Sequence, residues 1–302
     1  MGRKLTAAPG LAPVVASVLL LACMPGCGRG PAQRSPGGED STSAFAVSFP
    51  RVHLFPAGAE TLRVEIHYLG VAPSPTTAPP ANGVTVTLGR GRPLTLQGDL
   101  DSQEWWSCVD SLSGRDLNGD GAVEAVLARS NGGGCATCRS VTVVSVQRGA
   151  PRVISPDAEP DLVPVELRRL RNDGRYQLLM LDNSWEEAHG FSAADSPRPL
   201  RVWAWTGRAY ADSTPAFRAF VRARMHAARE EACSLEGSSL EGRWLGRLAE
   251  YVLDAEPIGE GRAALDTLRA HLAAHPPVTP GLAATATEVE VALANRLRRR
   301  TP

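Results

Sequence analysis

The spacing of apolar and polar residues divides the chain into a strand-rich part and a helix-rich part. Apolar and polar positions alternate over residues 62–68 (LRVEIHY), which is typical of a half-buried strand. Two further apolar runs, 84–88 and 93–96, flank Gly89-Arg90-Gly91 and predict a β-hairpin. From residue 214 onward, apolar residues recur at helical spacing instead.

Glycine and proline punctuate the helix-rich part into four predicted helices. In the first of them, Phe217, Phe220, Val221 and Met225 fall on one helical face. The four predicted helices cover residues 216–232, 240–253, 261–274 and 283–297. We therefore expect a mostly β body over residues 44–213, followed by an α-helical region over residues 214–302.

An internal repeat lies within the predicted β body. Leu117 and Leu170 each begin an Asn/Asp-Gly turn that leads into an apolar run, at an offset of 53 residues. Each copy continues into a strand–turn–strand pair, over residues 141–149 and 200–208. A unit of roughly fifty residues is typical of propeller blades and similar arrays. We predict two blade-like repeats, forming a β-propeller fragment or a related β assembly, with residues 44–100 as a third diverged unit or as the completion of a sandwich.

The N-terminus predicts export. Arg3 and Lys4 precede a short apolar run over residues 11–22, which is too short to span a membrane. Leu20-Leu21-Ala22-Cys23 resembles the lipobox of bacterial lipoproteins, which implies a signal peptide over residues 1–22 and lipidation of Cys23. The resemblance implies a membrane-anchored protein of the cell envelope, at the outer membrane or cell surface in a two-membraned organism. Plain secretion is the alternative if Cys23 is not lipidated.

Composition narrows the function further. Residues 23–43 are rich in Gly, Pro and Ser and predict a flexible tether. The chain has 32 basic and 32 acidic residues, so its zero net charge gives no basic footprint for nucleic acid. Lys4 is the only lysine, which excludes Schiff-base chemistry and a phosphate-loop lysine from the mature chain.

One loop has the pattern of a calcium site. Calcium prefers several oxygen ligands, and alternate positions of a tight loop direct their side chains inward. The predicted ligands are Asp116, Asn118, Asp120, the backbone carbonyl of Ala122, and Glu124. An EF-hand is excluded, because its twelfth position requires an acid and is Leu127 here. The alternative is a turn that is satisfied by its own Asx hydrogen bonds.

Residues 116–127 (DLNGDGAVEAVL) resemble the calcium loops of FG-GAP/VCBS-type β-repeats, in which an acidic loop leads directly into a strand. The resemblance covers residues 105–214 and implies a β-propeller fragment in which calcium stabilises the structure. In the second copy, Arg169 and Arg171 stand where Asp116 and Asn118 stand in the first. We therefore expect the second loop to bind no metal.

The cysteines predict a structural disulfide. Cys135-x-x-Cys138 follows three glycines and precedes a predicted strand, so it lacks the helix N-terminus that activates a redox thiol. In an exported chain, a disulfide is the expected state, with Cys108 as a candidate partner for either cysteine. A thiol–disulfide protein that uses Cys135 and Cys138 remains an alternative.

These patterns predict a non-enzymatic, calcium-stabilised envelope lipoprotein that acts as a binding or scaffold module for an unidentified protein or glycan. The chain lacks a Gly-x-Ser-x-Gly elbow, a His-Glu-x-x-His helix and a phosphate loop. The alternative is an envelope hydrolase whose site lies in the loop over residues 185–189 (WEEAH).

Overall fold

The computed structural model describes residues 51–68, 81–97, 105–130, 139–156, 162–236 and 240–299. The predicted signal peptide, Cys23 and the predicted tether lie outside the described residues.

The described β part consists of three four-stranded antiparallel sheets, each a simple meander of consecutive strands. The first sheet contains β1 (Arg51–Ala57), β2 (Glu60–Tyr68), β3 (Ala81–Leu88) and β4 (Leu94–Gln97). The second contains β5 (Trp105–Val109), β6 (Val123–Ser130), β7 (Arg139–Gln147) and β8 (Ala150–Val153). The third contains β9 (Leu162–Arg168), β10 (Gln177–Asp182), β11 (Leu200–Trp205) and β12 (Tyr210–Asp212).

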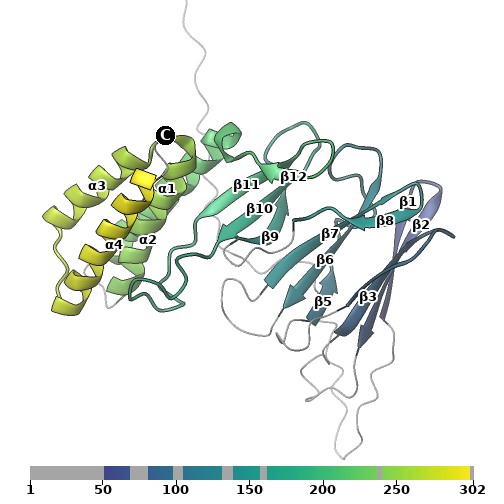
Figure 1. Ribbon diagram of the computed structural model, residues 1–302, viewed down its shortest axis with the longest axis horizontal. Helices are drawn as coiled ribbons and strands as arrows, with labels where there is room; N and C mark the ends of the chain where they lie inside the picture. Colours follow the sequence, from purple (N-terminus) through teal and green to yellow (C-terminus); the bar gives the residue numbers. More distant parts are fainter. Residues whose placement is uncertain are drawn as a thin grey trace, which may run out of the picture.

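The three sheets stack face to face, and the helices cover the far side of the third sheet (Figure 1). Alternation along β2 directs Leu62, Val64 and Ile66 toward the second sheet, where they pack with Leu127 and Val144. The second sheet is buried on both faces. Its strands therefore carry nearly continuous apolar runs, as is usual for a sheet covered on both sides.

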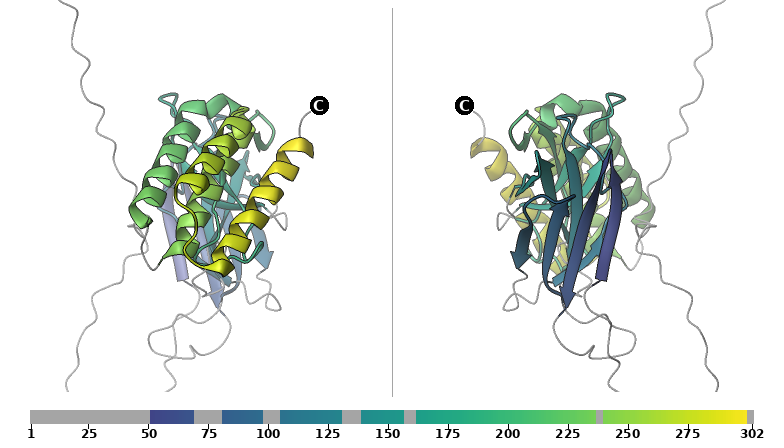
Figure 2. Two further views of the ribbon diagram at one scale, coloured as in Figure 1. Left: turned by 90° about the vertical axis from the view of Figure 1, so that its left-hand side faces the viewer. Right: turned by 90° about the vertical axis from the view of Figure 1, so that its right-hand side faces the viewer.

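A second core fills the space between the second and third sheets. It contains Val126 and Val143 from one side and Leu178 and Met180 from the other. On the opposite face of the third sheet, Leu179 and Val202 pack against Phe217 at the start of the helical region. Figure 2 shows the resulting order of layers from both ends of the molecule. The outer face of the first sheet is exposed and includes Val52 and Leu54.

The helical region forms a separate core of its own. It contains η1 (Thr214–Phe217), α1 (Arg218–Leu235), α2 (Glu241–Ala255), η2 (Glu256–Ile258), α3 (Gly261–Ala274) and α4 (Pro280–Arg299). Gly259 ends η2 in the left-handed conformation (φ 80°), and its N–H donates to the carbonyl of Glu256. Leu245, Leu253, Leu268 and Leu293 are among the fully buried residues of this core.

The four predicted helices and the C-terminal helical region are confirmed. The prediction of a mostly β protein is wrong, because the described helices contain about as many residues as the described strands. The chain is a mixed α and β protein, and the described strands do not close into a propeller. None of the described helices is both long enough and apolar enough to cross a membrane.

Candidate functional site: the acidic loop before β6

The candidate site is the loop that joins β5 to β6. Its two ends are closed by backbone bonds, since Gly114 donates to the carbonyl of Glu124 (2.8 Å) and Glu124 donates to the carbonyl of Arg115 (2.9 Å). The chain between Arg115 and Glu124 must therefore reverse direction, because the bridge that joins these two residues is antiparallel. Gly119 and Gly121 make this possible, because both adopt positive φ (79° and 83°), which a side chain would disfavour.

Asp116 organises the exposed side of the loop. Its Oδ1 accepts the N–H of Gly119 (2.7 Å), and its Oδ2 accepts the N–H of Gly121 (2.9 Å). Farther along, Oδ1 of Asn118 accepts the N–H of Asp120 (2.9 Å). The Asx turns therefore satisfy several loop amides without any added ligand.

The last predicted ligand, Glu124, is fully buried although it carries a carboxyl group. Its Oε2 accepts the N–H of Leu117 (2.7 Å), and its Oε1 accepts a longer bond from Nδ2 of Asn118 (3.4 Å). Burial raises the pKa of Glu124 to about 7; the Leu117 N–H opposes this rise, and the negative charges of Asp120 and Asp116 add to it. Within the described part of the chain, no cationic side chain pairs with Glu124.

The donor set fits a hard cation in its chemistry. Four of the five predicted ligands lie in this loop, and Glu124 follows at the start of β6; all five offer an oxygen atom, and three of these oxygens come from carboxylates. The side chains are arranged around the loop's own amides, and among the described residues no three His, Cys, Asp or Glu side chains form a metal-binding group. Two of the five predicted ligands, the side-chain amide of Asn118 and the backbone carbonyl of Ala122, do not belong to these four side-chain types.

The second copy builds the same loop with different charges. Leu170 donates its N–H to Oε1 of Gln177 (2.8 Å), as Leu117 does to Glu124 in the first copy. Arg175 donates its N–H to Oδ1 of Asp173 (3.0 Å). A neutral amide therefore takes the position of the buried carboxyl group.

The two loops touch each other across the space between the second and third sheets. The N–H of Tyr176 donates to the carbonyl of Leu117 (2.7 Å), and the Arg175 side chain lies over Gly119. Tyr210 donates its hydroxyl to the carbonyl of Tyr176 (3.5 Å). The pKa of Tyr210 is raised by burial and by the carboxylates of the acidic loop. The sequence did not predict these contacts. In the alignment of the two repeats, Arg175 occupies the position of Ala122, and this gives no sign that its side chain lies over Gly119.

The candidate cysteines are only partly described. Cys108 is half-buried on β5, directly ahead of the acidic loop, and it forms no disulfide with another described residue. Its candidate partners Cys135 and Cys138 lie outside the described residues. The disulfide and the thiol–disulfide alternative therefore stay predictions.

The loop of the hydrolase alternative packs against the helices. Trp185 is 3 % exposed and belongs to the helical core. His189 lies against Trp185, with ring centroids 4.5 Å apart, and its Nδ1 is 3.1 Å from Oε1 of Glu288 on α4. Glu187 and His189 both adopt positive φ (55° and 54°). These contacts give the loop a role in holding the third sheet on the helical region, and no serine, threonine or cysteine hydroxyl or thiol bonds to His189 within the described residues.

No family model, no curated protein and no solved structure matches this chain.

Proposed function

We propose that this chain is a non-enzymatic envelope lipoprotein that binds calcium in the loop over residues 116–124 and acts as a binding or scaffold module. The observation that carries the proposal is the state of Glu124, a fully buried carboxyl group without a cationic partner among the described residues. A divalent cation between Glu124 and the carboxylates of Asp116 and Asp120 would supply the missing charge.

The architecture supports a structural role for this metal. Each of the three sheets is a four-stranded meander stacked on its neighbour, which is how propeller blades are built and packed. We propose that the sheets are blade-like repeats related to the FG-GAP/VCBS type. The acidic loop lies where the second sheet meets the third, so calcium would strengthen the contact between two repeats.

Thermal unfolding tests the calcium proposal. The protein is the mature chain carrying Cys23→Ser, melted with excess calcium and with chelator. A ligand present at about 100 times its dissociation constant stabilises the folded state by about 2.7 kcal/mol. We expect calcium to raise the melting temperature of this protein and Asp116→Ala to remove the increase. The control is Asp173→Ala, the acid of the second loop that corresponds to Asp120, which should leave the calcium effect intact.

Equal melting temperatures with calcium and with chelator, at a concentration of calcium in the millimolar range, would refute the metal site. The loop would then be an Asx turn that stabilises itself. Magnesium in place of calcium provides a further comparison, because the smaller ion requires a more regular octahedral shell.

The lipid anchor is tested in cells with the full chain. Metabolic labelling with a radioactive fatty acid should mark the wild-type protein and the Cys27→Ala variant, but not Cys23→Ala. Cys27 is the matched control because it is the next cysteine, four residues farther along the chain. An unlabelled wild-type protein that appears in the medium would show secretion without an anchor.

A further inference from the structure

A belt of arginines runs along one end of the three sheets. We call it the arginine rim and define it by Arg90, Arg92, Arg115, Arg148, Arg169, Arg171, Arg175 and Arg208. All eight side chains are exposed, and all eight lie in the connections that follow odd-numbered strands. In a meander, these alternate connections lie at the same end of the sheet.

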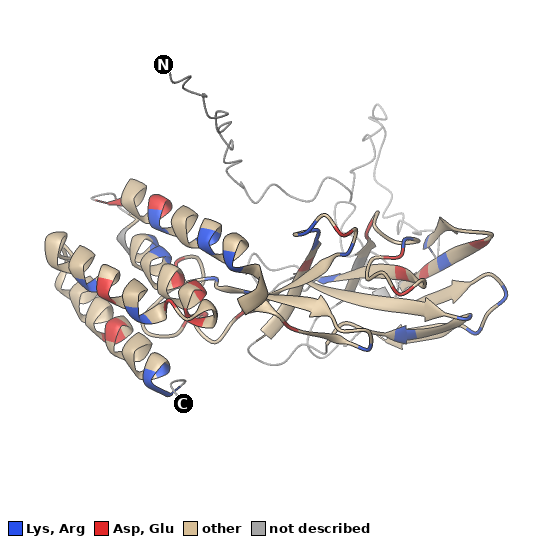
Figure 3. Cartoon of the chain, turned by 90° about the horizontal axis from the view of Figure 1, so that it is seen from above, with Lys and Arg blue, Asp and Glu red and all other residues tan. Residues whose placement is uncertain are grey.

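Contacts between the connections show that the three sheets share this end. Arg92 in the β3–β4 turn donates its N–H to the carbonyl of Gly149 in the β7–β8 turn (3.2 Å). Tyr176 in the β9–β10 loop donates to Leu117 in the β5–β6 loop. In Figure 1 the turns of this end lie along the upper edge of the sheets, and Figure 3 looks down on them.

The rim carries a local excess of positive charge in a chain that is neutral overall. Its connections contain eight arginines, no lysine or glutamate, and the four acids Asp110, Asp116, Asp120 and Asp173. Within the described residues, no rim arginine forms an ion pair with a carboxylate. By contrast, six arginines of the helical region do so: Arg222, Arg224, Arg243, Arg247, Arg269 and Arg296. Arg171 donates to the carbonyl of Ala216 (3.3 Å) and lies over the ring of Phe217, 4.3 Å from its centroid. The other rim guanidinium groups, which are exposed and form no ion pair within the described residues, can bind an external anion.

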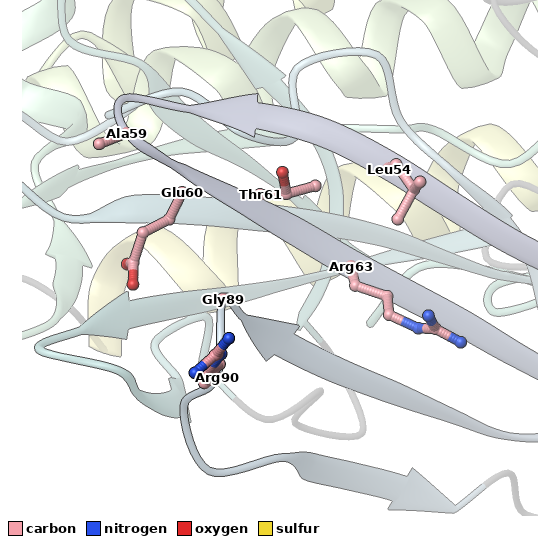
Figure 4. A pocket seen from close by; sticks show the side chains of 7 residues that line it. All are labelled: Leu54, Ala59, Glu60, Thr61, Arg63, Gly89 and Arg90. Carbon is pink, nitrogen blue, oxygen red and sulfur yellow. The ribbon is translucent and has the colours of Figure 1, made fainter.

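The rim is open rather than pocket-like. Figure 4 shows a shallow depression at one end of it, where Arg90 projects from the turn after β3 and Glu60 lies at the start of β2. A second cleft runs between Asp120 and Arg148. Neighbouring stacked sheets are about 10 Å apart, so the rim extends over roughly 20 Å across three sheets. Such a row suits an extended polymer with repeated charges better than a small ion.

We propose that the arginine rim binds an acidic polysaccharide whose sugars carry carboxylates. The planar guanidinium group matches a carboxylate through two parallel hydrogen bonds, so a row of arginines fits a row of uronate groups. The rim also points away from the chain's entry into the first sheet. β1 runs from Arg51 toward the rim, so the described chain enters the first sheet at the end opposite the rim.

Calcium would regulate this surface, an inference that rests on the proposed function. The acidic loop lies in the middle of the rim, where Asp116 and Asp120 would repel a polyanion. A bound calcium ion cancels two negative charges at that point and makes the rim more uniformly positive. Polysaccharide binding should therefore be tighter with calcium than with chelator.

The test measures binding of a short, soluble oligogalacturonate, which does not gel with calcium, to the immobilised mature chain carrying Cys23→Ser. The rim variant is Arg90→Gln/Arg92→Gln/Arg148→Gln, which changes no predicted calcium ligand. Each arginine near an anionic surface contributes about 1 kcal/mol to binding, which is about fivefold in affinity. The loss of three arginines should therefore weaken oligogalacturonate binding on the order of 100-fold. The control is Arg218→Gln/Arg229→Gln/Arg299→Gln, three exposed arginines of the helical region, which should bind like the wild type.

The outcomes separate the rim from the calcium site. Equal binding by the rim variant and the wild type overturns the proposal, even if calcium still raises the melting temperature. Binding that the rim variant loses but calcium does not change supports the rim and refutes its regulation by calcium. Preference for duplex DNA or for anionic vesicles over the oligogalacturonate also overturns the proposal, and a neutral dextran should not bind.

Discussion

The main-chain N–H of Leu170 donates to Oε1 of Gln177 over 2.8 Å, and this bond reproduces the 2.7 Å bond from Leu117 to Oε2 of Glu124 in the preceding sheet. The two loops therefore share a hydrogen-bonding scheme in which one long side chain reaches back to cap the loop's start. They differ in charge, since one cap is a neutral amide and the other a buried carboxyl group. The difference indicates that a carboxyl group is not needed to build the loop.

Glu124→Gln should separate loop folding from metal binding. The amide can accept the Leu117 N–H as Gln177 accepts that of Leu170, so we expect the variant to fold. The variant no longer buries an ionised group, so at pH 7.5 in chelator it should be at least as stable as the wild type. It should, however, lose the calcium-dependent increase in melting temperature, because the cation loses a charged ligand. Paired melts with calcium and chelator measure both effects.

The reciprocal change, Gln177→Glu, is the matched control. Arg169 and Arg171 occupy the second loop where the first has Asp116 and Asn118, so the added carboxyl group should create no calcium response. The variant should also be less stable at pH 7.5, because it buries a carboxyl group where the wild type has an amide. A new calcium response in this variant would show that the capping acid alone determines binding.

The pH dependence of stability should report on Glu124. Its pKa is raised to about 7 in the folded protein from an ordinary value of 4.5, so the folded state holds a proton that the unfolded state has released between those pH values. In chelator, this group's contribution therefore falls as pH rises from 4.5 through 7, by at most about 3 kcal/mol. Chemical unfolding of the wild type and of Glu124→Gln across this range should give converging stabilities at low pH and diverging ones at high pH.

Calcium should invert this behaviour at the same group. A cation that needs the ionised carboxylate competes with the proton, so calcium affinity should decrease as pH falls below 7.

A second buried acid also affects the pH dependence of stability. Burial raises the pKa of Asp254 to about 6, but this group contributes equally to the wild type and to Glu124→Gln and cancels when the two are compared. If the unfolding free energies of the wild type and Glu124→Gln change in parallel with pH, the raised pKa does not belong to Glu124.

The elements that the sequence predicted are those with strong local periodicity. The alternation in β2 and the helical faces of α1 to α4 bury their apolar residues as their spacing predicts. β1, β5 and β9 were not predicted. In β1, the exposed positions include Val52 and Leu54, so apolar residues lie on both faces and the alternation is hidden. The helices have nearly the predicted bounds, and the mostly β classification failed because long stretches of the predicted β body, such as residues 110–122 and 183–199, form loops rather than strands.

Within the candidate site, the sequence predicted what is local. Asp116 to Glu124 lie within nine residues, so one loop necessarily brings them together. The contact between Leu117 and Tyr176 depends on the stacking of two sheets and could not be inferred from spacing. Likewise, the Trp185 loop has the composition of an exposed site, and only the packing of α1 to α4 against it shows that its aromatic ring is buried.

A buried ion network should make the junction between the third sheet and the helices sensitive to single substitutions. Asp182 on β10 pairs with Arg296 on α4 (2.7 Å), and Arg201 on β11 pairs with Glu256 of η2 (3.2 Å). Burial alone would raise the pKa of Asp182, but Arg296 and its other partners lower it. Asp182→Ala leaves buried guanidinium charge uncompensated and should cost about 3–5 kcal/mol of unfolding free energy, measured by chemical denaturation.

The double variant Asp182→Leu/Arg296→Met tests the cause of that loss. Replacing both charges with apolar side chains of similar size removes the uncompensated charge, so the double variant should be more stable than Asp182→Ala. Glu256 remains to pair with Arg201. If the unfolding free energy lost in the double variant equals the sum of the losses in Asp182→Leu and Arg296→Met, the two side chains stabilise the protein through independent contacts instead.

The close approach of the loop after Trp185 to α2 should make Gly246 intolerant of any side chain. A Cβ atom on Gly246 would overlap the carbonyl oxygen of Asp195, which is backbone and cannot rotate away as a side chain could. Gly246→Ala should therefore displace this loop and destabilise the protein by more than the 1–3 kcal/mol that is typical of overpacking, on the order of 4 kcal/mol. Gly281→Ala in α4 is the matched control, since no atom lies within 4 Å of its Cβ position and alanine favours a helix by about 1 kcal/mol. Chemical denaturation should thus show opposite signs for the same substitution, whereas a neutral Gly246→Ala would mean that the loop can leave α2 at no cost.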